Sequence, residues 1–264
     1  MKKLLHVALL VFSLISVLNA QKITSKSFNE VMELSGINKQ MLEYPSLVKA
    51  GMTSSKNQNN DMSDKEFSQM LSVVDEAFKP SKILTSIGIE IKKNVSQKDA
   101  KSLLKWYKSD IGKYITKAEE DSSTAQAYMQ MIKEVKVLLK NQKKVFFAKR
   151  IDKLLKSTQM VVELQINTAI AIFTAMNKPS KSDMTIFRSQ ISRQKHIIEK
   201  NAHEMIILSY VYAYKNISNE DLEKYMNFLN QKSTIKFNDS ATRGIVKALN
   251  NSSQQLATKL SQNL

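Results

Sequence analysis

Residues that interrupt helices are scarce in this chain, which has five glycines and three prolines among 264 residues. Apolar residues recur at spacings of three and four, as in the run from Ile151 to Met176, and no strand-like alternation recurs. That spacing places apolar side chains on one face of a helix, whereas alternation would indicate strands. The sequence therefore predicts an all-α fold, a compact bundle of about seven to nine helices.

Residues 1–20 have the layout of a secretory signal peptide. Lys2 and Lys3 precede an almost wholly apolar run from Leu4 to Leu18, and Ala20 offers a cleavage point. The run is short for a membrane span, and no stop-transfer pattern follows it. We therefore expect an exported protein, periplasmic or secreted. Its mature chain, residues 21–264, is predicted to be a single all-helical domain without a transmembrane helix.

Composition narrows the classes of function. The chain has no cysteine, which excludes disulfides, lipoprotein attachment and thiolate chemistry. Its formal net charge is +16. In a cytosolic protein such a charge would suggest nucleic acid, but export favours an anionic envelope component or an envelope protein as partner. The basic residues are also spread along the chain as singlets and pairs, which is typical of a solvated surface.

Clusters of polar residues mark the expected breaks between helices. Residues 54–64 read as a loop, Pro80 as an interruption or a helix start, and residues 177–183 as a separator of two long helices. Ser96 followed by Asp99 has the pattern of a helix-capping box. The polar C-terminal segment, residues 250–264, is expected to fray.

A faint internal repeat appears when the chain is shifted by about 122 residues, so that 94–115 lies over 216–237. Ser96 and Asp99 then match Ser218 and Asp221, and Trp106 falls on Phe228. Because cap, aromatic position and apolar phase coincide, the bundle could consist of two related helical halves.

The segment "WYKSDIGKYI" carries a resemblance to a known family. Its start, Trp106-Tyr107-Lys108-Ser109-Asp110-Ile111-Gly112, resembles the F/W-Y-x-S-P-x-G signature of exported bacterial all-helical proteins of unknown function. The segments "ELSGINKQMLEYPSLVKAGM", "RIDKLLKSTQMVVELQINTAIAIFTAMN" and "ISNEDLEKYMNFLNQKSTIKF" extend the resemblance over nearly the whole mature chain. Asp110 replaces the usual proline, and the second copy of the signature is degraded. The resemblance implies an exported helical domain and carries over no catalytic residues.

The signature segment itself predicts a structural corner. Ser109 can cap a second helix after Trp106 and Tyr107, and Gly112 would then lie inside that helix. We expect the missing side chain of Gly112 to allow close approach of another helix, and Trp106 to anchor the core side of the corner.

The strongest candidate for metal binding is "HIIEKNAHE", in which His196, Glu199 and His203 share one helical face. The two histidines are two turns apart, about 10.5 Å along the axis, so one ion cannot easily reach both. We therefore predict no metal site and no cofactor, and keep these three residues as the set to test. Glu119, Glu120 and Asp121 are adjacent carboxylates whose side chains point apart on a helix, which disfavours an acid–base pair. No catalytic constellation is evident, and we expect a non-enzymatic protein.

Three further segments leave alternatives open. "KNQKKVFFAKR", from Lys140, is either a basic patch for an anionic surface or a helix whose phenylalanines point inward, and the second interpretation is favoured. The apolar runs that begin at Met160 and Met205 read as buried helices. They either fill a core or surround a pocket. The expected function is thus a non-enzymatic, envelope-associated interaction protein. The alternative is a carrier of a hydrophobic small molecule or lipid between helices.

Overall fold

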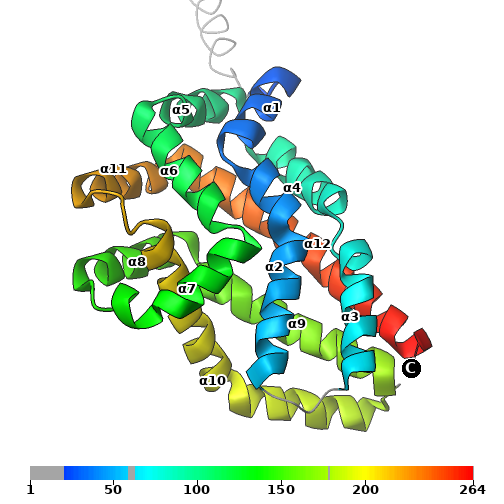
Figure 1. The fold of residues 1–264 in the computed structure, drawn as a ribbon. Helices are drawn as coiled ribbons and strands as arrows, with labels where there is room; N and C mark the ends of the chain where they lie inside the picture. Colours follow the sequence, from blue (N-terminus) through cyan, green and yellow to red (C-terminus); the bar gives the residue numbers. More distant parts are fainter. Residues whose placement is uncertain (1–20, 59–62, 178, 264) are drawn as a thin grey trace, which may run out of the picture.

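The computed structural model describes residues 21–58, 63–177 and 179–263, and these residues are helical almost throughout (Figure 1). In this part of the chain the one extended contact is an isolated bridge between Lys22 and Ser96. The all-α prediction is confirmed, and the predicted signal peptide lies outside the described residues. The helices are α1 Ser25–Leu34, α2 Ile37–Gln58, α3 Asp64–Ala77, α4 Pro80–Asn94, α5 Gln97–Tyr107, α6 Asp110–Ser122, α7 Ala125–Leu138, α8 Gln142–Leu155, α9 Ser157–Asn177, α10 Lys181–Ala213, α11 Asn219–Leu229 and α12 Lys232–Asn263.

The twelve helices of the described part exceed the seven to nine predicted. Part of the difference comes from very short breaks between helices, at which the sequence has no cluster of polar residues. Gly36, with φ of 75°, separates α1 from α2, and Lys156, with φ of 55°, separates α8 from α9. A single residue in the left-handed region ends a helix without a loop, so such breaks are hard to read in sequence.

Helix α12 runs obliquely through the centre of the fold and packs against α3, α4, α5, α9 and α11 (Figure 1). Its contact with α4 is close because Gly244 has no side chain. A Cβ at that position would lie 2.8 Å from the backbone nitrogen of Ile87. The main apolar core surrounds this crossing, and a smaller core joins α7, α8 and α10.

Serine caps set the starts of four helices. The hydroxyls of Ser96, Ser109, Ser180 and Ser218 accept hydrogen bonds from backbone N–H groups in the first turns of α5, α6, α10 and α11. At Ser96 and Ser180 the third helical residue is an aspartate that completes a capping box. These local bonds satisfy N–H groups that have no partner within the helix.

The two repeat segments adopt corresponding structures. The bounds of α5 and α11 differ by 122 residues at both ends, 219 minus 97 and 229 minus 107. Helices α6 and α12 each begin two residues after the C-cap residue of the helix before them. The equivalent aromatics Trp106 and Phe228 stack on each other with ring centroids 4.6 Å apart. The two segments therefore contact each other through the residue that the repeat aligns.

Three sequence expectations need correction. Helix α2 continues to Gln58, so residues 54–58 are helical and do not belong to a loop. Helix α12 extends to Asn263, and Ser252 and Leu256 are buried, so the polar C-terminal segment is helical and its first part, as far as Leu256, packs into the fold. Helix α9 is a half-buried helix, in which Val162 is buried and Glu163 is exposed, because it packs against α12 and α10 and leaves its remaining face open.

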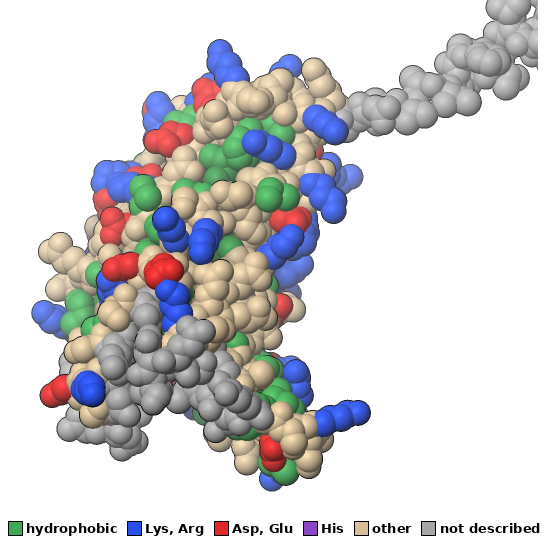
Figure 2. Space-filling view, turned by 90° about the vertical axis from the view of Figure 1, so that its right-hand side faces the viewer, with side chains coloured by type: hydrophobic (Ala, Val, Ile, Leu, Met, Phe, Trp, Pro, Cys, Tyr) green, Lys and Arg blue, Asp and Glu red, His purple; other side chains and the backbone are tan. Residues whose placement is uncertain are grey.

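Charged side chains are spread over the surface. Figure 2 shows Lys and Arg side chains distributed over one face, with Asp and Glu among them. Ion pairs such as Lys39–Glu120 and Lys236–Asp99 link helices across the surface. On this face the basic charge is therefore spread out and forms no single block.

Candidate functional site

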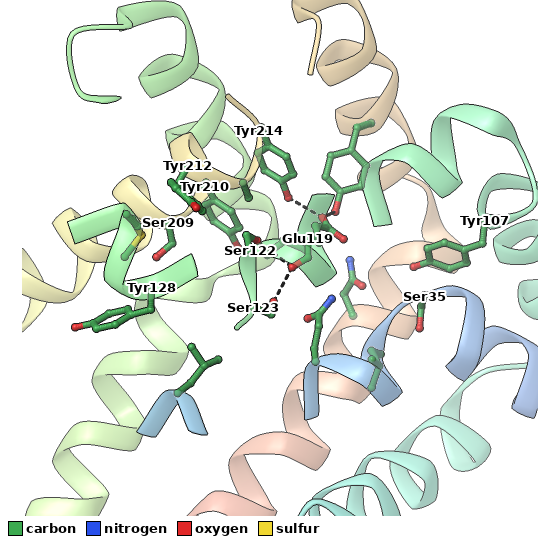
Figure 3. Close-up of a pocket in the computed structure, with 18 of the residues that line it drawn as sticks. Ser35, Tyr107, Glu119, Ser122, Ser123, Tyr128, Ser209, Tyr210, Tyr212 and Tyr214 are labelled. Atoms are coloured by element: carbon green, nitrogen blue, oxygen red, sulfur yellow. Dashed lines mark hydrogen bonds between the residues drawn. The ribbon is translucent and has the colours of Figure 1, made fainter. Parts of the chain in front are cut away.

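A pocket of about 390 Å³ lies between the end of α6, the C-terminal part of α10, α11 and α12, with α2 and α7 at its edge. Glu119 stands at its centre. Tyr214 points toward Glu119 from one side, and Tyr107 lies on the opposite side (Figure 3). We call this space the Glu119 pocket. Its lining comprises Ser35, Ile37, Gln40, Leu47, Tyr107, Glu119, Ser122, Ser123, Tyr128, Met131, Leu155, Ser209, Tyr210, Tyr212, Ala213, Tyr214, Tyr225, Phe237 and Asn238.

The helical phase of α6 turns Glu119 inward. Gly112, Ile115 and Thr116 are buried and lie on the same face, seven, four and three residues before it. The next residue, Glu120, points to a different side and pairs with Lys39 at 3.0 Å. The adjacent carboxylates therefore point apart, and only one of them reaches the pocket.

Two tyrosine hydroxyls hold the Glu119 carboxyl. The hydroxyls of Tyr214 and Tyr225 donate to Oε1 over 2.6 and 2.7 Å. Burial raises the pKa of Glu119 above its ordinary value, and the two hydrogen bonds oppose that shift because they favour the ionised form. Burial also raises the pKa of both tyrosines, so they remain neutral donors.

A further tyrosine hydroxyl closes the wall at α10. The hydroxyl of Tyr210 shares a 2.5 Å hydrogen bond with Ser157 at the start of α9. Its ring stacks on Tyr214 with centroids 5.9 Å apart, and Tyr214 meets Tyr225 edge-on at the same distance. Because each ring is held by a neighbour and each of these three hydroxyls by a partner, the wall is preorganised.

The signature corner lies directly behind this wall. The Ser109 hydroxyl accepts from the N–H of Gly112 at 3.1 Å and donates to the carbonyl of Trp106 at 2.6 Å. The backbone that approaches Gly112 is this Trp106 carbonyl at the end of α5. A Cβ on Gly112 would lie 2.8 Å from its carbon. The Trp106 ring stacks on Tyr225, 6.0 Å away, and so connects the corner with the pocket.

The histidine set lies in a second, more open pocket of about 830 Å³ between α8, α9 and α10. There His203 Nδ1 lies 3.2 Å from Asp152 Oδ2, and Glu199 pairs with Lys195 at 3.5 Å. His196 is exposed. Among the described residues no group of three or more potential ligands comes close enough to hold a metal ion. His203 and Glu199 therefore have separate partners, and the three residues do not converge on one point.

The basic segment from Lys140 fits each of its two interpretations, basic surface patch and inward-pointing phenylalanines, only in part. Phe147 is buried, whereas Phe146 is 54% exposed at the start of α8. Lys144 is buried and its ammonium group donates to the carbonyl oxygen of Ile217. The preferred interpretation, with both phenylalanines inward, is wrong for Phe146 because α8 turns only one of two adjacent positions to the core.

Sequence reasoning missed Glu119 as a site residue. The signal that could have found it is its phase, because Glu119 follows Ile115 by four residues on an otherwise apolar face. Its tyrosine partners are about 100 residues away in the chain, and no local pattern connects them. The structure identifies Ser157 as the partner of the Tyr210 hydroxyl and Glu119 as the partner of the Tyr214 hydroxyl.

The arrangement suits binding of a small molecule. It offers a carboxyl with a raised pKa, neutral hydroxyl donors and aromatic walls inside one pocket. Within the described part of the chain no helix is both long and apolar enough to cross a membrane. The family resemblance of the signature stays a prediction, because comparison with protein-family models, curated proteins and solved structures finds no match for this chain.

Proposed function

We propose that this is an exported, non-enzymatic protein that binds a small molecule in the Glu119 pocket. The observation that carries the proposal is a carboxyl held by two tyrosine hydroxyls inside a pocket of about 390 Å³. Pockets of about 300–1,000 Å³ with few, well-placed polar groups are typical of small-ligand sites. The volume is too small for a lipid with two long acyl chains. The ligand is therefore a small molecule with both polar and apolar groups.

The test is to purify the mature chain under native conditions and search for a retained small molecule by native mass spectrometry. Ser209→Phe, on the pocket wall, should fill the space and abolish retention. Ser182→Phe is a matched control, because Ser182 is exposed on the same helix and does not line the pocket. Ligand-free preparations, together with no thermal shift in a library of small amphipathic compounds, would contradict the proposal.

A second candidate is association with an anionic membrane surface through the α7–α8 corner, which we define as Lys136, Val137, Leu139, Lys140, Lys143 and Phe146. All six residues are exposed, Val137 by 70%. No ion pair to Lys136, Lys140 or Lys143 is present among the described residues. Unpaired lysines around apolar tips match a surface of anionic head groups over an apolar layer.

Vesicle sedimentation tests this candidate. Phe146→Ser should weaken binding to vesicles that contain anionic phosphatidylglycerol, whereas Leu42→Ser should leave binding unchanged, since Leu42 is 61% exposed on α2, outside the corner. Equal binding to vesicles with and without anionic lipid would exclude this surface as the membrane site.

A further inference from the structure

The charge of the Glu119 pocket is opposite to that of the whole protein. The chain has 40 Lys and Arg residues, yet the residues that line the pocket include no Lys, Arg or His and one acidic residue, Glu119. Lys39 binds the neighbouring Glu120, and neither of these two residues lines the pocket. An ionised Glu119 therefore has no countercharge in the wall of its pocket.

One oxygen of the Glu119 carboxyl is available to a ligand. Both tyrosine hydroxyls donate to Oε1, and no donor reaches Oε2 among the described residues. Oε2 is also not among the side-chain atoms that are fully enclosed without a partner. Oε2 therefore keeps accessible surface, and Glu119 is one of the residues that line the pocket.

The walls beside this oxygen are aromatic. The rings of Tyr107, Tyr210, Tyr214 and Tyr225 line the pocket, and three of them form a chain of ring contacts with centroid spacings of 5.9 Å. The face of an aromatic ring attracts a cation through its quadrupole, most strongly where water is excluded. A carboxylate beside several such rings is the arrangement that recognises organic ammonium groups.

We propose that the Glu119 pocket binds a small organic cation, a primary amine or a quaternary ammonium compound, with its charged nitrogen beside Oε2 of Glu119. This inference rests on the proposed function, and it specifies the chemical class of the ligand. A cation supplies the countercharge that the wall lacks. A neutral ligand would leave an ionised carboxylate uncompensated or require Glu119 to be protonated.

The experiment compares cations with uncharged molecules of the same shape. Choline is paired with 3,3-dimethyl-1-butanol, and phenethylamine with phenethyl alcohol, in calorimetric titrations of the mature chain. Emission of Trp106 gives a second readout, because this single tryptophan stacks on Tyr225 in the pocket wall. We expect at least one cation to bind about tenfold or more tightly than its neutral counterpart.

Two variants at neighbouring positions test whether the Glu119 carboxylate is the charge that recognises the cation. Glu119→Gln keeps the shape of the side chain and should remove the preference for the cation, whereas Glu120→Gln should preserve it. Because the cation pairs with ionised Glu119, its affinity should also fall as the pH drops below the pKa of Glu119. The other titratable groups around this carboxyl in the pocket are Tyr107, Tyr210, Tyr214 and Tyr225, and they remain neutral over this range. Besides burial, the charge of Glu120, which points away from the pocket, also raises the pKa of Glu119.

The outcomes separate the two proposals. Equal binding of a cation and its neutral counterpart, unaffected by Glu119→Gln, would overturn the ligand class and leave small-molecule binding in place. A preference for the cation that survives in Glu119→Gln would also overturn it, since the charge would then be recognised elsewhere. Absence of binding by all four probes would refute this ligand class. The proposed function falls only if the native preparation and the compound library are also negative.

Discussion

Replacing Gly112 by alanine tests whether the α5–α6 corner depends on a missing side chain. A Cβ at this position would lie 2.8 Å from the carbonyl carbon of Trp106, well inside the contact distance that carbon atoms tolerate. The Ser109 hydroxyl and backbone N–H both bind the Trp106 carbonyl, so it cannot turn away freely. The corner must therefore open. Overpacking of this kind typically costs about 1–3 kcal/mol.

The matched control is Gly51→Ala. Gly51 lies inside α2, and a Cβ there would meet nothing within 4 Å. Both substitutions gain the helical preference of alanine over glycine, about 0.5–1 kcal/mol, so the difference between them isolates the steric cost at Gly112. For a chain of this size about 1 kcal/mol shifts the melting temperature by about 2–4 °C. Gly112→Ala should therefore melt about 2–12 °C below Gly51→Ala.

Thermal unfolding followed by circular dichroism measures the difference, and Trp106 emission reports whether the corner itself has changed. A Gly112→Ala protein that melts as high as Gly51→Ala, with an unchanged emission spectrum, would refute the close-approach reasoning. The corner would then depend on the Ser109 cap alone.

Three further predictions concern the helix crossing and the pocket. Gly244→Ala should destabilise the fold by about 1–3 kcal/mol in chemical denaturation, because its Cβ would press on the backbone of Ile87. The raised pKa of Glu119 means that protonation favours the folded state. This stability is fully present below the unfolded pKa, near 4.5, and is lost as the pH rises through the folded pKa. Glu119→Gln should flatten this part of a plot of unfolding free energy against pH. Tyr225→Phe removes one donor to the carboxylate, so a ¹³C NMR titration should show the pKa of Glu119 rising further.

Local signals explain which parts of the fold the sequence predicts well. Ser96 with Asp99 and Ser218 with Asp221 mark helix starts correctly because a cap and its backbone partners lie within three residues. The C-terminal part of α12 is different. Its polar composition indicates fraying, yet Ser252 is buried because α9 packs against this part of the helix. Burial that neighbouring helices impose leaves no trace in local composition.

The Glu119 pocket is a second feature that local sequence patterns do not predict. In the sequence Glu119 is one of three adjacent acidic residues, and the helical pattern indicates only that their side chains point apart. The tyrosines that hold it come from α10 and α11, and only the tertiary fold brings them to α6. The signature segment was interpreted as a structural corner, and the structure places that corner against the pocket wall through the stacking of Trp106 on Tyr225. Substitutions in the corner should therefore affect ligand binding as well as stability.

The two candidate functions use opposite charges, and salt distinguishes them. The lysines of the α7–α8 corner are exposed, so their attraction to an anionic surface is screened over about 8 Å at physiological ionic strength and should weaken steeply as salt is added. Glu119 acts at contact distance inside a pocket, where screening by salt is much smaller. As salt is added, a protein that holds a small cation and is attached to an anionic surface should therefore dissociate from the surface before it releases the cation. Cation binding that persists at a salt concentration that abolishes vesicle binding would show that the pocket works independently of the surface.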